Sequence, residues 1–206
     1  MSEVQERDGR KPGGRGVLVG ALAALVALVV LYAVVAVVFK SGRAQGLKPL
    51  ATGEMSKLQV AKEDQPPPAL TAEGPDGKAV NLAQFRGKVV VVNLWATWCA
   101  PCVKEMPTLA KLQADYGAKG LQVLPVSLDK GDEIAKAKAF LADKPPLRFF
   151  HADYSLAFQL MPVEQGLPTT ILYDRDGHER ARLAGGADWS SPEARKVIDR
   201  LLAGKA

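Results

Sequence analysis

One continuous apolar run constrains the fold of this chain more than any other feature. Residues Lys88–Trp95 read KVVVVNLW, a β-branched stretch typical of a strand that is buried on both faces. A second apolar strand is expected over Leu121–Asp129, and helical patterns follow the two strands, the second over Asp132–Ala142. Strands that alternate with helices predict an α/β fold around a central sheet.

The remaining elements fit the same plan. A strand is expected over Leu147–Phe150 and a short helix over Tyr154–Leu160, followed by a hairpin at the edge of the sheet that begins with Thr169–Asp174. Ser191 precedes Pro192 and predicts the start of a last helix. Upstream, the Gly74-Pro75-Asp76-Gly77 cluster predicts the turn of a small hairpin between residues 70 and 82.

A long uncharged segment precedes this domain. Residues 17–39 read VLVGALAALVALVVLYAVVAVVF, and as a helix at ~1.5 Å per residue they would span about 35 Å, enough to cross a bilayer. A cleaved signal peptide is the alternative, but its apolar stretch would be only ~7–15 residues long. We therefore expect a retained signal anchor that makes this a single-pass protein.

The charges around this segment indicate its orientation. Residues 1–16 hold four basic side chains, Arg7, Arg10, Lys11 and Arg15, and three more follow the segment at Lys40, Arg43 and Lys48. The positive-inside bias is slight, but it favours a cytoplasmic tail at residues 1–16.

The segment that follows the anchor has the composition of a tether. Residues 40–68 contain few large apolar side chains and end in Pro66-Pro67-Pro68, which favours an extended, semi-rigid conformation. We therefore expect a linker over residues 40–68 and a folded domain over residues 69–206.

The charge pattern does not point to nucleic acid as a partner. The chain has 27 basic and 22 acidic residues, for a net charge of +5, and the basic residues are spread along the chain rather than gathered into a patch. The pattern indicates a mixed, solvated surface and does not indicate nucleic-acid binding.

The only two cysteines of the chain, Cys99 and Cys102, form a Cys-x-x-Cys pair between the central strand and the helix after it. Two cysteines exclude a disulfide-rich scaffold and a four-cysteine zinc module. Cys99 is expected at a helix N-terminus, where backbone amides and the helix dipole favour a thiolate. Cys102, one turn further, is expected to be more buried and to resolve a mixed disulfide.

Two other interpretations of the cysteine pair stay open. A zinc half-site would need further ligands, and the two histidines, His151 and His178, are distant from the pair and not spaced as a zinc-binding pair. An inert buried pair is the other alternative, but Pro101 between the cysteines and the flanking Trp95 and Trp98 argue against it.

The run LWATWCAPCVKEMP, residues 94–107, resembles the active-site signature of membrane-anchored thioredoxin-like proteins, most closely the TlpA group, which is related to the ResA and CcmG proteins. The resemblance extends over about Ala69–Ala206 and includes FRGK at Phe85–Lys88. It implies a thioredoxin-like fold with an added N-terminal β-hairpin, preceded by one transmembrane helix. It also implies that Pro107 bends the active-site helix without ending it, and that Pro168 lies in a cis-proline loop facing the cysteines.

One position departs from the pattern of cytosolic thioredoxins. Those proteins usually have a buried aspartate six residues before the first cysteine, where it accepts the proton of the resolving thiol, and this chain has Asn93 there. An amide cannot take that proton. Glu105 matches a glutamate of the ResA-like branch and could hold the role, whereas a solvated helix glutamate is the alternative.

The resemblance also implies a function. A bacterial thiol:disulfide oxidoreductase is expected, anchored in the inner membrane with its C-terminal domain in the periplasm and using no cofactor. It would reduce partner cysteines in cytochrome oxidase copper-centre or cytochrome c assembly, and a membrane thiol-reductant carrier would restore its dithiol.

Two other functions are considered for a chain of this kind. A copper metallochaperone of the same fold usually has Cys-x-x-x-Cys and a distant histidine ligand. The two-residue spacing between Cys99 and Cys102 argues against this function. A peroxiredoxin usually has Thr-x-x-Cys, and Ala96 occupies the threonine position here.

Overall fold

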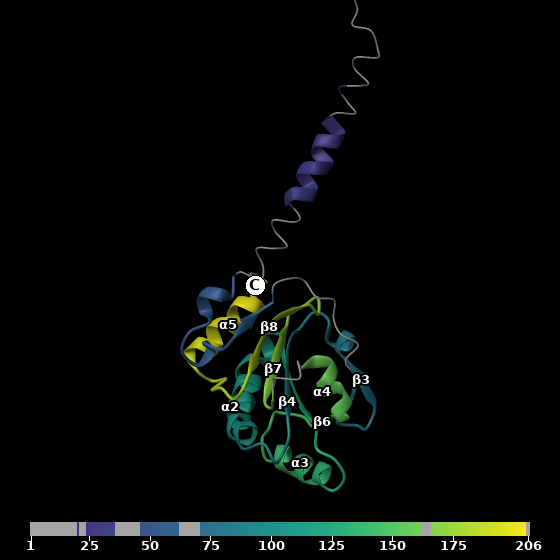
Figure 1. The fold of residues 1–206 in the computed structure, drawn as a ribbon, viewed down its shortest axis with the longest axis vertical. Coiled ribbons are helices and arrows are strands. Elements are labelled where there is room, and N and C mark those ends of the chain that lie inside the picture. The colour runs from purple at the N-terminus through teal and green to yellow at the C-terminus, as the bar shows by residue number, and fades with distance from the viewer. Residues whose placement is uncertain (1–19, 21–23, 36–45, 62–70, 162–165, 205–206) are drawn as a thin grey trace, which may run out of the picture. The chain divides into compact units, whose positions relative to one another are not determined.

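The computed structural model describes residues 20, 24–35, 46–61, 71–161 and 166–204 (Figure 1). The chain divides into two units, Met1–Lys40 and Ser41–Ala206. In the first unit, residues 24–35 form a helix whose side chains are all exposed. None of the helices within the described ranges is both long and apolar enough to span a membrane. The predicted tail 1–16 lies outside the described residues, as do parts of the predicted anchor 17–39 and linker 40–68.

The described part of the second unit is built on an eight-stranded mixed sheet with the strand order β1-β8-β7-β4-β5-β6-β2-β3. Its centre is β4 (Val89–Trp95), which is buried at all seven positions. β4 runs parallel to β5 (Leu121–Ser127) and antiparallel to β7 (Thr169–Tyr173). The α/β architecture and the central strand predicted from the KVVVVNLW run are confirmed.

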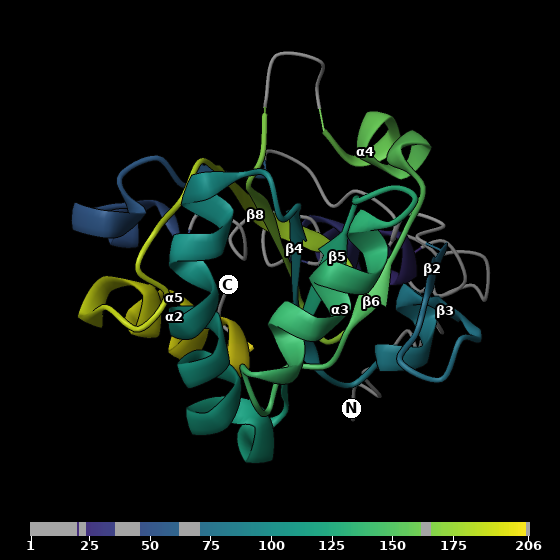
Figure 2. The same cartoon turned by 90° about the horizontal axis from the view of Figure 1, so that it is seen from below.

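Helices cover both faces of this sheet. Their bounds are α2 (Ala100–Tyr116), α3 (Glu133–Ala142), α4 (Tyr154–Leu160) and α5 (Pro192–Leu202). Side chains of β4 alternate between the faces, because Val91 and Trp95 pack in one core with α2 and α5, whereas Val92 and Leu94 pack in the other with α4. Figure 2 shows α2 and α5 on one side of the sheet and α4 on the other. The central strand is therefore apolar on both faces.

Helix α2 starts at the active-site motif and continues through a proline. Cys99 is its N-cap residue and Pro107 lies inside it, yet the helix runs on to Tyr116. The prediction that Pro107 does not end the helix is confirmed. α5 begins as predicted, with the Ser191 side chain accepting a hydrogen bond from the Ala194 N–H.

Residues 46–61, which were expected to be linker, are part of the folded domain. They form two short 3-10 turns, η1 (Lys48–Leu50) and η2 (Gly53–Met55), and strand β1 (Gln59–Val60). Leu47 and Met55 are fully buried in the core that contains α2. The linker prediction is wrong for this stretch, because its few large apolar side chains are enough to dock it. We call residues 46–61 the strap.

The strap also changes the edge of the sheet. β7 and β8 (Glu179–Ala184) form the predicted hairpin, but β1 pairs with β8 on its outer side through Gln59 and Val60. The hairpin was expected at the sheet edge, and the structure places β1 there instead. The pairing joins segments more than 100 residues apart, which a local pattern cannot reveal.

The other edge is formed by β2 (Thr71–Glu73) and β3 (Ala79–Asn81), an antiparallel pair at the position of the expected small hairpin. β2 pairs in turn with β6 (Phe150–His151). β6 starts later than the predicted strand at Leu147, because the Leu147 N–H bonds the Lys144 carbonyl at 3.0 Å and continues the turn after α3.

Candidate active site

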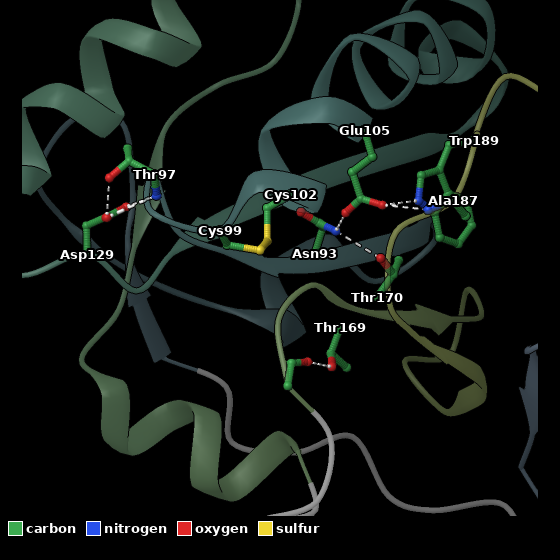
Figure 3. Close-up of a disulfide and its surroundings, with 11 residues drawn as sticks. Asn93, Thr97, Cys99, Cys102, Glu105, Asp129, Thr169, Thr170, Ala187 and Trp189 are labelled. Carbon is green, nitrogen blue, oxygen red and sulfur yellow. Dashed lines mark hydrogen bonds between the residues drawn. A yellow bond between two sulfur atoms is a disulfide. The ribbon is translucent and has the colours of Figure 1, made fainter.

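The two cysteines form a disulfide where β4 leads into α2 (Figure 3). Cys99 is the N-cap residue of α2, and Cys102 lies in its first turn. Cys99 is 6% exposed and Cys102 is fully buried. This is the order of exposure that the sequence predicted for a cysteine that attacks first and a cysteine that resolves.

A buried carboxylate holds the loop that leads to Cys99. Asp129 follows the carboxyl end of β5 and is 1% exposed. Its two oxygens lie 3.0 and 3.1 Å from the backbone nitrogen of Thr97, and they also accept hydrogen bonds from the hydroxyls of Thr97 at 2.7 Å and Ser127 at 2.8 Å. The His151 ring contacts the backbone oxygen of Asp129 at 2.9 Å. Asp129 therefore fixes the turn two residues before the reactive cysteine.

A second buried carboxylate, Glu105, lies one helical turn beyond Cys102. It is 3% exposed, so it is not a solvated helix residue. Its Oε1 accepts a hydrogen bond from Asn93 Nδ2 at 2.7 Å, and its Oε2 accepts from the Ala187 N–H at 3.1 Å and from Trp189 Nε1 at 3.3 Å. Glu105 thus joins α2, β4 and the segment between β8 and α5.

Burial changes the acidity of Glu105. Desolvation raises the pKa of its carboxyl from 4.5 to about 7, although the hydrogen bonds from Asn93, Ala187 and Trp189 act in the opposite direction. A carboxyl with this pKa can take up or release a proton near neutral pH, which suits a general acid-base group.

A pocket of about 390 Å³ lies beside Glu105. It is lined by Glu54 of the strap, by Pro101, Lys104, Glu105 and Thr108 of α2, and by Gly186, Ala187 and Asp188. The strap reaches the same place through the Glu54 carboxylate, which accepts a hydrogen bond from the Asp188 N–H at 3.1 Å. Because Glu105 lines this pocket, its carboxyl has a path for proton exchange with the solvent.

Pro168 lies in the loop before β7, and the Leu167–Pro168 bond is cis, as predicted. The loop is closed by a hydrogen bond from the Thr169 hydroxyl to the Gly166 carbonyl at 2.9 Å, and the Pro168 carbonyl accepts from the Gly185 N–H at 2.8 Å. The role of Pro168 in catalysis stays a prediction.

An exposed aromatic side chain stands next to the disulfide. Trp98 directly precedes Cys99 and is 63% exposed, whereas Trp95 is fully buried. Large exposed aromatic side chains are typical of contact surfaces. The two tryptophans that flank the motif therefore differ, one belonging to the core and the other to the surface around Cys99.

Candidate metal ligands lie elsewhere in the described residues. Asp174, Asp176 and His178 come together in the turn between β7 and β8. Asp174 Oδ1 accepts hydrogen bonds from the backbone nitrogens of Asp176 and His178, both at 3.0 Å. These contacts close the hairpin turn. The sulfurs of Cys99 and Cys102 are bonded to each other in a disulfide.

Several residues of the site were not predicted. Asp129 gave a weak signal, because it is a charged residue at the end of a predicted buried strand. Trp189 is a large aromatic in a polar segment, and Ala187 contributes only its backbone N–H, which has no sequence signature. The structure joins Cys99 and Cys102 in a disulfide, places Glu105 one helical turn beyond Cys102 on α2, and adds these contacts around them (Figure 3).

Comparisons with known proteins agree with this geometry. The Redoxin family model matches residues 62–198. The chain is 32% identical over 131 residues to the thiol-disulfide oxidoreductase ResA of Bacillus thuringiensis subsp. konkukian, covering 59% of this chain and 67% of that protein. It is 33% identical over 132 residues to the thioredoxin-like protein YneN of Bacillus subtilis, covering 59% of this chain and 72% of YneN.

Solved structures show the same similarity. A DsbF homologue from Corynebacterium diphtheriae superposes with a TM-score of 0.60 at 26% identity, covering 70% of this chain and 93% of that one. A protein described as a candidate DsbE thiol:disulfide interchange protein from Chlorobium tepidum gives a TM-score of 0.59 at 31% identity, covering 68% and 96%. Both similarities include most of those chains' length.

Proposed function

Because this chain belongs to the redoxin family and is a thiol-disulfide oxidoreductase, we propose that it is a membrane-anchored reductant of protein disulfides in the bacterial periplasm. The observation that carries the proposal is the asymmetry of the cysteine pair. Cys99 is at the head of α2 next to an exposed tryptophan, whereas Cys102 is fully buried on the side of Glu105.

In the proposed reaction, the Cys99 thiolate attacks one sulfur of a client disulfide. The client S–S bond breaks, and its other sulfur leaves as a thiolate and takes up a proton. Cys102 then loses its proton and attacks the Cys99 sulfur, which releases the second client sulfur and forms the Cys99–Cys102 disulfide. Two electrons pass from the chain to the client, and the protons of the two client thiols come from solvent, because Cys99 reacts as a thiolate.

Glu105 is proposed to receive the proton of Cys102. Its pKa of about 7 leaves part of the population ionised at neutral pH and able to accept a proton. Its position one helical turn from Cys102 on α2 supports this role. Asn93, which replaces the acid of cytosolic thioredoxins, bonds to Glu105 and does not itself titrate.

The proposal also includes a membrane anchor and a class of client proteins. The uncharged run at residues 17–39 and the exposed apolar helix over residues 24–35 support anchoring in the inner membrane. The periplasm is kept oxidising, so a reductant there needs a membrane carrier that returns its dithiol. From the resemblance to the TlpA group, the proposed clients are assembly factors of cytochrome oxidase copper centres or cytochrome c.

Trapping tests this function. In a Cys102→Ser variant the mixed disulfide with a client cannot be resolved, so client adducts should accumulate in cells and disappear under reductant. Cys99→Ser is the matched control and should trap no client. If Cys102→Ser gives no adduct, and the native protein binds Cu(I) without reducing any disulfide, the copper chaperone alternative replaces the proposal.

Labelling tests the location. A thiol reagent that cannot cross the inner membrane should reach Cys99 in intact spheroplasts after mild reduction. Lysed cells serve as the positive control for labelling. If only lysed cells are labelled, the proposed orientation is wrong.

A further inference from the structure

Asn93 uses one end of its amide and leaves the other end unused. The side chain is fully buried in the centre of β4. Its nitrogen donates to Glu105 Oε1 at 2.7 Å and to Thr170 Oγ1 at 2.9 Å. Its oxygen has no hydrogen-bond partner among the residues that the structure describes. A buried polar atom without a partner is rare enough in proteins to need a physical explanation.

The direction of this oxygen follows from the strand and from its two partners. Val91 and Trp95, which alternate with Asn93 along β4, pack in the core that contains α2, so Asn93 faces α2 as well. The Glu105 carboxylate and the Thr170 hydroxyl together define which end of the amide is the nitrogen. The oxygen therefore points away from both of them.

That direction is toward the disulfide. Figure 3 shows the Asn93 side chain between Cys102 and Glu105, with the oxygen on the cysteine side. Cys102 and Glu105 are three residues apart on α2, which places them one turn apart on the same face of the helix. One amide can therefore contact Glu105 with its nitrogen and the Cys102 sulfur with its oxygen.

In the disulfide form this second contact cannot be a hydrogen bond, because neither sulfur holds a proton. Reduction changes this. A dithiol reductant supplies two electrons and two protons, the S–S bond breaks, and one proton is placed on the Cys102 sulfur. The Cys102 thiol is then a hydrogen-bond donor that lies beside the unpaired Asn93 Oδ1.

We propose that Asn93 Oδ1 accepts a hydrogen bond from the Cys102 thiol in the reduced protein, so that Asn93 is a positioning residue for the resolving cysteine. This deepens the proposed function and rests on it. The bond stabilises the protonated form of Cys102, which leaves the attack on a client disulfide to Cys99. The same amide connects the Cys102 proton to Glu105, its proposed acceptor.

The small number of cysteines makes a direct test possible. In a Cys99→Ser variant, Cys102 is the only thiol of the chain, so the infrared S–H stretching band reports on Cys102 alone. The band should lie at the lower frequency of a hydrogen-bonded thiol. A band at the frequency of a free thiol in an apolar solvent overturns the proposal, whatever the other variants do.

Two further variants in this background assign the acceptor. Asn93→Leu has nearly the same shape and no acceptor, so it should move the S–H band to higher frequency. The acid dissociation constant of Cys102 should rise by about fivefold, the value of one ordinary hydrogen bond. Thr170→Val is the matched control, because it removes the other partner of the amide nitrogen and should leave the band in place.

Asn93→Asp separates positioning from packing. Aspartate keeps an oxygen on the cysteine side, so the S–H band should stay at low frequency. If the S–H band has the same frequency in the Cys99→Ser protein and in the same protein with Asn93→Leu, and the two have the same circular dichroism, then Asn93 is not the acceptor. Client trapping by Cys102→Ser does not depend on this bond, so failure of the proposed function and failure of this inference give different results.

Discussion

The two sides of the disulfide each hold a buried carboxylate, and the two carboxylates differ in their surroundings. Asp129 lies on the Cys99 side and is 1% exposed, and Glu105 lies on the Cys102 side and is 3% exposed. Asp129 is bound by the loop amide and hydroxyl of Thr97 and by the hydroxyl of Ser127. Glu105 is bound by two side-chain nitrogens and one amide, which come from β4 and from the segment between β8 and α5.

The two carboxylates differ in function, because Asp129 positions a loop and Glu105 can exchange a proton. The contacts of Asp129 hold the turn that leads into α2, so its contribution is to the geometry of Cys99. Glu105 borders a pocket, and desolvation raises its pKa to about 7, so it can exchange a proton while the protein stays folded. Burial of a carboxylate therefore does not by itself indicate acid-base chemistry. The donors around it and its access to a pocket decide the role.

The largest expected effect comes from removing Asp129. Asp129→Ala leaves the Thr97 N–H and the Ser127 hydroxyl without their acceptor, and it leaves the Thr97 hydroxyl with only the longer contact to Glu133 Oε2 at 3.5 Å. At about 1–3 kcal/mol for each unsatisfied buried donor, the free energy of unfolding should fall by about 3–5 kcal/mol. Urea unfolding of the oxidised protein measures this loss.

Asp129→Asn is the control for this prediction. Its amide oxygen can still accept from the Thr97 N–H, so it should lose less than half of the stability that the alanine variant loses. Equal losses in the two variants would mean that the negative charge, rather than the hydrogen bonding of the loop, is what Asp129 contributes.

Glu105 should affect pH dependence instead. Its carboxyl has a pKa of about 7 in the folded protein against an ordinary value of 4.5. The stability from this group is fully present below pH 4.5 and is lost as the pH rises through about 7, a loss of roughly 3 kcal/mol. Glu105→Gln cannot ionise and should remove this loss.

The measurement is the urea midpoint of the oxidised protein between pH 4 and pH 8, compared between the parent and Glu105→Gln. The difference between the two profiles isolates Glu105 from the other titrating groups. Parallel profiles would show that Glu105 does not titrate in this window, and the contrast with Asp129 would then disappear.

The parts of this structure that follow from local pattern could be predicted from the sequence. The β-branched run at Lys88–Trp95 specifies the central strand whatever surrounds it, and the Cys-x-x-Cys at its end specifies the head of α2. The strap could not be predicted, because Leu47 and Met55 stand singly among polar residues and dock on distant elements. Its strand β1 pairs with residues 181 and 182, a contact with no local signal.

The site divides in the same way. Cys99, Cys102 and Glu105 lie within one segment, so the motif and its resemblance to a family were enough to select them. The partners of Glu105 come from β4 and from residues 187–189, and one of them is a backbone amide that any residue could supply. The environment that raises the pKa of Glu105 is therefore a property of the tertiary structure.

A smaller effect is expected at Ser127. Its hydroxyl donates to Asp129 Oδ2 at 2.8 Å and accepts from the Asp129 N–H at 3.2 Å, and Ser127→Ala removes both bonds while the Thr97 contacts remain. The free energy of unfolding should fall by about 2 kcal/mol, the net value of two hydrogen bonds, at every pH between 5 and 8. A loss as large as that of Asp129→Ala would show that Ser127, and not the loop amide, is the main partner.

The smallest expected effect concerns the indole of Trp189. Its Nε1–H donates to Glu105 Oε2 at 3.3 Å, and this bond lowers the pKa of Glu105, though by less than the bonds from Asn93 and Ala187. Trp189→Phe keeps an aromatic ring and the backbone contact of residue 189 to the Thr108 hydroxyl but removes the donor. The pKa of Glu105 should therefore rise further, by less than about one unit, and the inflection of the pH–stability profile should move to higher pH.

The smaller ring lowers stability equally at all pH values, so the position of the inflection, and not the depth of the profile, is the readout. In the Glu105→Gln background the same substitution should shift no inflection, and a shift toward lower pH in the parent would mean that Trp189 destabilises the Glu105 carboxylate rather than stabilising it.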